Sequence, residues 1–189
     1  MIDETLLSIS VTVTQYRQFE ANRNQEKIAD FIVERFTERY ITPLRGDHHR
    51  KHGFCTIAIC CLMIEALESF QRGWPHSRGK SESAFCFFFD RSPNLSIFQG
   101  YASDFYKHVR CGILHQAETT NGWRIRRDGP LFDQSTKTIN ATKFHNEMEI
   151  CLQEYTDTLK ASDWDSEVWK NLRKNMNAII AHCSTSKEL

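Results

Sequence analysis

Two residues in one short segment, Arg110 and His115, have side chains that could together carry out phosphodiester chemistry. They lie five positions apart in HVRCGILHQAE. Arginine stays cationic and binds phosphate oxygens through a planar set of donors, while histidine exchanges a proton near neutral pH. The pair could therefore cut RNA, with Arg110 as the cation for a phosphate and His115 as the group that exchanges a proton.

Basic and polar residues around this pair extend the candidate site. From residue 107 to residue 127 the chain carries five Lys and Arg against one acid, Glu118, a local charge of +4. Overall, 24 Lys and Arg balance 24 Asp and Glu, which excludes a histone-like protein and leaves a local patch as the place for a polyanion. Trp123 either stacks on a base or covers the core. The candidate substrate-binding residues are Lys107, His108, Glu118, Arg124 and Arg126.

The segment that carries the pair has the apolar period of a helix. Five apolar residues recur three and four positions apart, at Phe98, Ala102, Phe105, Val109 and Ile113. This spacing predicts a helix over about residues 95–117 with one buried face and its polar residues facing out. On an ideal helix, residues five apart point about 140° from each other. Arg110 and His115 are therefore neighbours only if the helix end distorts or a second subunit completes the site.

The rest of the chain predicts a mainly α-helical, compact bundle in a single domain. Residues 4–20 are ambiguous between strand and helix, and we expect a helix because the rest of the chain is helical. Residues 54–64 are apolar nearly all round, which predicts a central buried helix. Alternation around Asp128-Gly129 predicts a small β-hairpin near residues 123–139. Further helices are expected over residues 24–40, 54–70, 84–90 (capped by Ser81 or Ser83), 144–159 and, capped by Asp163, to about 183.

The sequence VRCGILHQAE resembles the Arg-x4–6-His motif of the HEPN superfamily, the higher eukaryotes and prokaryotes nucleotide-binding domains. Those proteins are compact helical bundles, typically dimers, and many are metal-independent endoribonucleases of toxin–antitoxin, CRISPR-linked and antiphage systems. The resemblance implies one HEPN-like domain over residues 1–189, with Arg110 and His115 as catalytic residues. In the implied mechanism His115 acts as general base or acid and Arg110 binds the scissile phosphate, with no metal ion and no other cofactor. It further implies RNA as substrate, a homodimer that brings two motif helices into one groove, and an antitoxin or regulatory partner.

Two other functions stay open. Cys111 stands where the superfamily usually has a polar residue such as Asn or Asp, and this departure favours a non-catalytic HEPN-like module that binds a nucleotide, RNA or a protein partner. Alternatively, Arg110 and His115 pair with surface carboxylates and have a structural role. The loop with His48, His49 and His52 lacks the spacing of a zinc site, so we expect no metal there.

Cysteine usage and hydropathy bear on the location of the protein. The seven cysteines are odd in number and form no C-x-x-C pair, which is typical of reduced thiols in the cytosol. The N-terminus is acidic where a signal peptide would be basic. The longest apolar run, residues 54–64, is shorter than the roughly 20 residues of a membrane span. We therefore expect a cytoplasmic protein with no membrane partner.

Overall fold

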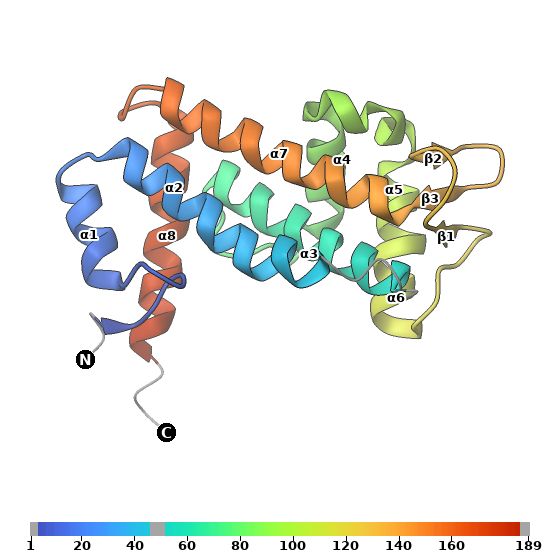
Figure 1. Cartoon of the computed structure of the whole chain (residues 1–189), viewed down its shortest axis with the longest axis horizontal. Coiled ribbons are helices and arrows are strands. Elements are labelled where there is room, and N and C mark those ends of the chain that lie inside the picture. Colours follow the sequence, from blue (N-terminus) through green and yellow to red (C-terminus); the bar gives the residue numbers. More distant parts are fainter. Residues whose placement is uncertain (1–3, 46–51, 186–189) are drawn as a thin grey trace. The chain divides into compact units, whose positions relative to one another are not determined.

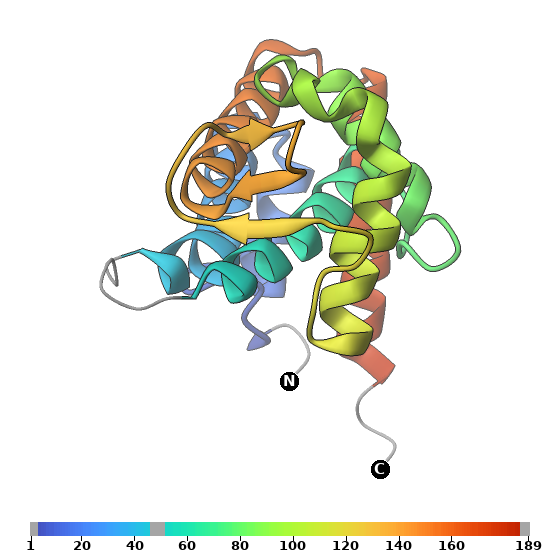
Figure 2. The ribbon, with the colours of Figure 1, turned by 90° about the vertical axis from the view of Figure 1, so that its right-hand side faces the viewer.

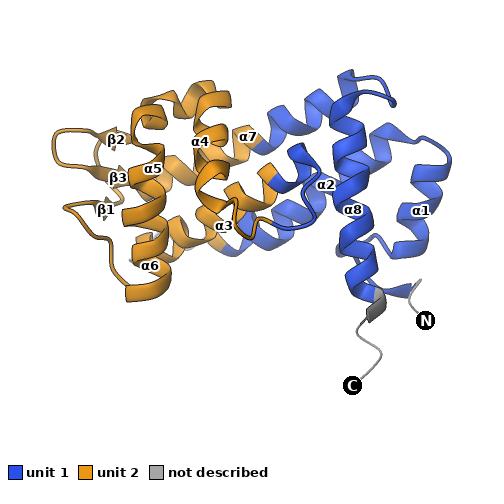
Figure 3. Cartoon of the chain, turned by 180° about the vertical axis from the view of Figure 1, so that it is seen from behind, with its two compact units in different colours: residues 1–43, 69–76, 152–189 blue, residues 44–68, 77–151 orange. Residues whose placement is uncertain are grey.

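The computed structural model describes residues 4–45 and 52–185, and His48 and His49 lie outside this part of the chain. The protein is mainly α-helical, as predicted, and the predicted small β insertion is a three-stranded sheet (Figure 1). The chain divides into two compact units, shown in blue and orange in Figure 3. Two long helices, α3 (Gly53–Arg72) and α7 (Ala141–Ala161), contribute residues to both units. Unit 1 comprises Met1–Pro43, Ser69–His76 and Leu152–Leu189, and unit 2 comprises Leu44–Glu68 and Ser77–Cys151.

Unit 1 contains helices α1 (Val13–Ala21), α2 (Gln25–Phe36) and α8 (Glu167–Thr185). The predicted helix over residues 4–20 forms only from Val13, because Thr12 caps it by accepting a hydrogen bond from the Gln15 amide. In contrast, α2 begins at the predicted position, after Asn24. The prediction that Asp163 caps the last helix is wrong, since α8 begins at Glu167 and Asp163 forms the turn before it.

Aromatic side chains build the core of unit 2. The rings of Phe89 and Phe98 stack with centroids 5.2 Å apart, those of Phe105 and Phe144 stack at 5.6 Å, and further rings pack edge to face around them. Trp123 is only 3% exposed and stacks on a core phenylalanine, so it covers the core and cannot stack on a base. These rings come from α4 (Ser81–Arg91), the segment that follows it, the sheet and α7.

The sheet has the strand order β1-β3-β2 and lies beside the motif segment (Figure 2). Its strands are β1 (Arg124–Arg126), β2 (Phe132–Asp133) and β3 (Thr138–Asn140). The predicted turn at Asp128-Gly129 is wrong for the hairpin, because the strands it joins, β1 and β2, do not pair with each other. Strand β3 pairs parallel with β1 and antiparallel with β2. The hairpin turn follows Asp133, whose carboxylate accepts hydrogen bonds from the Ser135 and Thr136 amides.

The predicted helix over residues 95–117 is helical as far as Gln116 but changes type along its length. A 3₁₀ segment (Pro93–Tyr101) leads into α5 (Ala102–Phe105), a π turn (Tyr106–Arg110) and α6 (Cys111–Gln116). The predicted buried face is confirmed from residue 98 to residue 109, and residue 113 is half-buried. A π turn inside an α-helix is uncommon and is often found at functional sites. It ends directly at Arg110.

The central helix α3 is longer than the apolar run in the sequence. By length and composition it could cross a membrane, with a mean hydropathy of 1.7 in its most apolar window. However, 61% of that window is buried inside the protein, as in the core helix of a folded domain. Two acidic residues, Glu65 and Glu68, also lie buried on this helix. An ionised group in an apolar interior needs a partner, so each of these two acids requires a cation or hydrogen-bond donors beside it.

Candidate functional site

Arg110 is largely buried and forms an ion pair with Glu65. Its Nε donates a hydrogen bond to Glu65 Oε1 at 2.9 Å, and the two side chains are 17% and 8% exposed. The Arg110 guanidinium also lies over the ring of Tyr106, at 5.6 Å from its centroid. The prediction that the polar residues of this helix all face out is therefore wrong for Arg110. The physical reason is the buried carboxylate on α3, which requires a cation.

The second oxygen of Glu65 is also bonded. Glu65 Oε2 accepts hydrogen bonds from Ser77 Oγ at 2.8 Å and from Ser81 Oγ at 2.7 Å. Ser81 thus serves this carboxylate and not the end of α4, whose first turn has no side-chain cap, contrary to prediction for Ser81 and Ser83. We refer to Arg110, Glu65, Ser77 and Ser81 as the Glu65 network. It fixes the position of Arg110 within unit 2.

Burial would by itself lower the pKa of Arg110, but the charge and the hydrogen bond of Glu65 outweigh burial and raise this pKa above its ordinary value. Arg110 is therefore always a cation. Among the described residues, Arg110 donates a hydrogen bond from Nε to Glu65 and makes a weak contact from Nη1 to Cys111 Sγ at 4.0 Å. Because guanidinium carries five N–H donors, the group keeps donors for another oxygen.

His115 lies near the end of α6 and is exposed. Within residues 4–45 and 52–185 its ring makes no hydrogen bond and no ion pair. Since α6 follows the π turn with ordinary helical geometry, residues 110 and 115 point about 140° apart. One copy of the chain therefore does not bring Arg110 and His115 together. Glu118 does not contact His115, because its Oε1 accepts from the amide and the hydroxyl of Thr119.

The other two residues predicted to touch substrate around the motif have different surroundings. Lys107 is exposed on the π turn. His108 is half-buried, and its Nδ1 shares a hydrogen bond with Thr120 Oγ1 at 2.8 Å, while its carbonyl accepts from the Thr120 amide at 2.9 Å. His108 thus holds the returning chain in place. Of the two, only Lys107 remains available for contact with a phosphate backbone.

Strand β1 presents its side chains alternately to two faces of the sheet. In the register of the sheet, Arg124 lies beside Thr138, which lies beside Asp133, so these three side chains form one row across the strands. Ile125, Ile139 and Phe132 form the next row, on the core face. The predicted residues Arg124 and Arg126 therefore share the open face. Arg126 pairs with Asp128 at 3.0 Å, so the basic patch in the sequence is partly neutralised.

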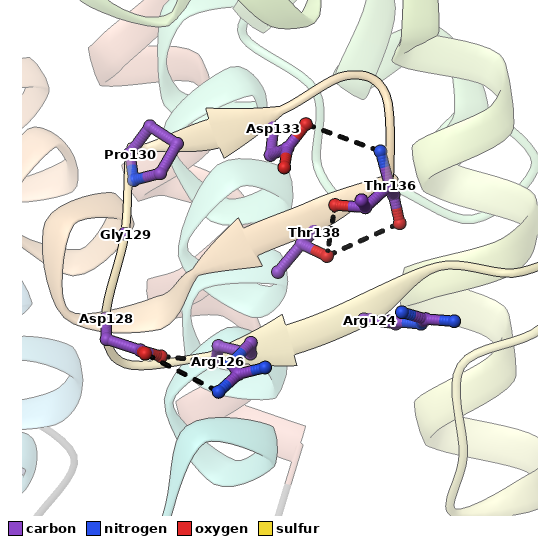
Figure 4. Close-up of a pocket in the computed structure, with 8 residues that line it drawn as sticks. All are labelled: Arg124, Arg126, Asp128, Gly129, Pro130, Asp133, Thr136 and Thr138. Carbon is purple, nitrogen blue, oxygen red and sulfur yellow. Dashed lines mark hydrogen bonds and ion pairs between the residues drawn. The ribbon is translucent and has the colours of Figure 1, made fainter.

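Two cavities adjoin this strand. The first, of about 230 Å³, lies on the open face of the sheet and is named the sheet cavity (Figure 4). The second, of about 420 Å³, is more apolar and is named the Phe54 cavity; it lies against Gly53, Phe54 and Ile125. Both cavities are lined in part by Arg126 and Asp128. The residues that line the sheet cavity are Arg124, Arg126, Asp128, Gly129, Pro130, Asp133, Thr136 and Thr138.

Metal binding needs a cluster of ligand side chains, and thiol chemistry needs an accessible, deprotonated cysteine. Among the described residues, no group of three or more His, Cys, Asp and Glu side chains could hold a metal ion. Cys60 and Cys61 are buried, and burial raises the pKa of both thiols. Buried, protonated thiols are poor nucleophiles and poor metal ligands.

Several residues of these sites were not predicted from the sequence. Glu65 is the partner of Arg110, and an acid within an apolar helix was the available signal. Asp133, Thr136 and Thr138 line the sheet cavity, and Phe54 lines its neighbour. The register of the strands would have placed these residues beside Arg124, but the register could not be predicted because the hairpin turn was predicted at the wrong position.

A comparison of the chain with protein-family models, with curated proteins and with solved structures found no match. The resemblance to the HEPN motif thus depends on residues 110–115 and on the helical pattern of the sequence alone.

Proposed function

We propose that this protein is a metal-independent endoribonuclease in which His115 transfers the proton and Arg110 binds the scissile phosphate. The observation that carries the proposal is the state of His115, an exposed imidazole that no described side chain engages. It lies on the helix that begins directly after a permanently charged, firmly positioned arginine. A proton-transfer group and a phosphate-binding group are the two requirements of this chemistry.

In the proposed reaction His115 accepts the proton of a ribose 2′-hydroxyl. The 2′-oxygen then bonds to phosphorus, the bond from phosphorus to the 5′-oxygen breaks, and the leaving oxygen takes a proton from the imidazolium. The products are a 2′,3′-cyclic phosphate and a 5′-hydroxyl. The remaining donors of Arg110 stabilise the charge that develops on the phosphate.

We place the complete site between two copies of the chain, because Arg110 and His115 point to different sides of α6 in one copy. His115 of one copy then acts on a phosphate bound by Arg110 of the other. Leu114, adjacent to His115, is 42% exposed and suits such an interface. The corresponding biological role is cytoplasmic defence or growth control, with an antitoxin or another regulatory protein as partner.

The test is incubation of the purified protein with total RNA in EDTA. We expect cleavage that leaves cyclic phosphate ends, and loss of this cleavage in His115→Ala without a change in thermal stability, because the residue is exposed. His76→Ala is a matched control, since His76 is also exposed. Cleavage that survives in His115→Ala would reject the site assignment.

A mixing experiment tests the shared site. If the site lies between copies, a mixture of His115→Ala and Arg110→Lys proteins contains dimers with one intact pair. Random exchange then restores about a quarter of the wild-type activity, although each variant alone is inactive. No recovery after exchange, with dimers present, would place both groups in one copy or reject the pair.

Two observations favour a second function, a non-catalytic module that binds a nucleotide, RNA or a protein partner. Glu65 engages Arg110, and neither the sheet cavity nor the Phe54 cavity includes Arg110 or His115. Absence of cleavage together with measurable RNA binding would support this function in place of the first.

A further inference from the structure

The sheet cavity combines groups of opposite hydrogen-bonding character on opposite sides. Arg124 lies on β1, Thr138 on the central strand β3 and Asp133 on β2, in one row across the sheet (Figure 4). Neighbouring strands are about 4.8 Å apart, so the Arg124 and Asp133 backbones are separated by about 10 Å. A ligand on this face meets N–H donors on one side and a carboxylate on the other, with hydroxyl groups between.

The charges of the cavity balance. Its two arginines, Arg124 and Arg126, face two acids, Asp128 and Asp133. Arg126 and Asp128 already pair with each other at 3.0 Å. The Arg124 side chain makes no hydrogen bond or ion pair with a residue in the described ranges, and only its backbone amide donates, to the Lys137 carbonyl at 3.0 Å. A phosphate on Arg124 would lie in the field of the Asp133 carboxylate, so the cavity is better suited to a neutral ligand with both donors and acceptors.

Asp133 is prepared to accept hydrogen bonds. Its Oδ1 accepts from the Ser135 amide at 2.9 Å, the Ser135 hydroxyl at 2.7 Å and the Thr136 amide at 3.3 Å. These bonds to Ser135 and Thr136 lower the pKa of Asp133, so the group is a carboxylate at neutral pH. Since all three bonds reach Oδ1, Oδ2 keeps acceptor capacity for a ligand.

Among the four RNA bases, guanine matches this arrangement. Its N1–H and N2 amino group are adjacent donors for one carboxylate, and its O6 and N7 are the acceptors that arginine binds in a bidentate manner. Adenine and cytosine offer a carboxylate only one amino group, and uracil offers one N–H. The volume of about 230 Å³ lies below that of cavities for drug-sized ligands and suits a single base.

We propose that the sheet cavity binds a guanine base of single-stranded RNA, with Arg124 on the O6 and N7 edge and Asp133 on the N1 and N2 edge. This proposal depends on the proposed function only in taking RNA as the ligand. It changes the expected role of Arg124 from binding phosphate to recognising a base. Guanine then determines where along the RNA the protein binds.

The test measures binding without cleavage. Fluorescently labelled 2′-O-methyl pentamers UUGUU, UUAUU, UUCUU and UUUUU lack the attacking hydroxyl, so they report binding whether or not the protein is a ribonuclease. By fluorescence anisotropy we expect the guanine pentamer to bind at least about fivefold more tightly than each of the others. Arg124→Ala and Asp133→Asn should each bring the four affinities close together. Lys143→Ala removes another exposed cation of unit 2 and should leave the guanine preference unchanged.

Three results would overturn the proposal. The first is equal affinity of the wild type for all four pentamers. The second is a guanine preference that survives in both Arg124→Ala and Asp133→Asn. The third is an equal loss of affinity for all pentamers in Arg124→Ala with the preference retained, which would make Arg124 a phosphate contact. Arg124 is exposed, so its variant should keep the fold. Cleavage in EDTA is a separate measurement and can succeed or fail independently.

Discussion

Replacement of Arg110 by methionine should destabilise the protein much more than loss of an ordinary ion pair. Arg110→Met removes the cation that pairs with the Glu65 carboxylate, which is only 8% exposed, while Ser77 and Ser81 still donate hydrogen bonds to it. Removing one partner of a buried pair typically costs about 3–5 kcal/mol. For a protein of this size, about 1 kcal/mol shifts Tm by roughly 2–4 °C, so we expect Tm to fall by roughly 6–20 °C.

Thermal and urea unfolding followed by circular dichroism would measure this loss. Arg126→Met is the matched control, because its pair with Asp128 is exposed at both ends, 64% and 74%, and should contribute almost nothing. In a double variant Arg110→Met with Glu65→Met, two apolar side chains replace the pair, and the total loss should be smaller than the sum of the single losses. A cost below about 1 kcal/mol for Arg110→Met, or strictly additive costs, would refute the inference that the pair is desolvated.

Two further substitutions test the loop after the motif and the sheet. Gly112→Ala should lower the free energy of unfolding by about 1–3 kcal/mol, because the new Cβ would lie 2.5 Å from the Glu118 carbonyl oxygen, whereas Gly100→Ala, with open space around it, should have little effect in the same denaturation assay. The lowered pKa of Asp133 means that the folded protein binds fewer protons than the unfolded chain below about pH 4. Its stabilising effect is therefore fully present above that pH and is lost as the pH falls through the lowered pKa, so Asp133→Asn should flatten the acid limb of stability against pH; an unchanged limb would contradict this.

Local sequence patterns predicted the helices and strands better than the tertiary contacts between them. The helical spacing of apolar residues predicted the buried face of the motif segment, and the alternation of apolar and polar residues predicted strands. Both patterns can be recognised within a few neighbouring residues. The contact between Arg110 and Glu65 joins residues 45 positions apart and follows from tertiary packing. A charged residue inside an apolar helix nevertheless predicts that a residue of opposite charge lies close to it. Both acids on α3 could have been assigned cations on this ground, and Glu68 does pair with Arg91.

The hairpin of the sheet could not be predicted from local sequence, because two turn signals compete. Asp128-Gly129 is a strong local turn signal, and Gly129 does adopt a positive φ of 86°. The competing turn begins at Asp133, where a side chain closes the loop by binding its own backbone two and three residues further on. Which of two turns forms the hairpin depends on which strand pairing buries Ile139, and this depends on the core of unit 2. The row that includes Arg124 and Asp133 could not be assigned before that choice was known.

The π turn before α6 also bears on how this segment could change during evolution. A π turn holds one residue more than an α turn, so every side chain after it is rotated by about 100° relative to an uninterrupted α-helix. The aromatic core contacts upstream and the orientation of His115 downstream therefore belong to two different helical phases of the sequence. Removal of a single residue within Tyr106–Arg110 would convert the π turn into an α turn, and the helix after it would keep its present direction. Conversion to an α turn with all five residues kept would instead rotate the side chains of α6 by about 100°. One deletion here would thus shorten the segment without reorienting His115.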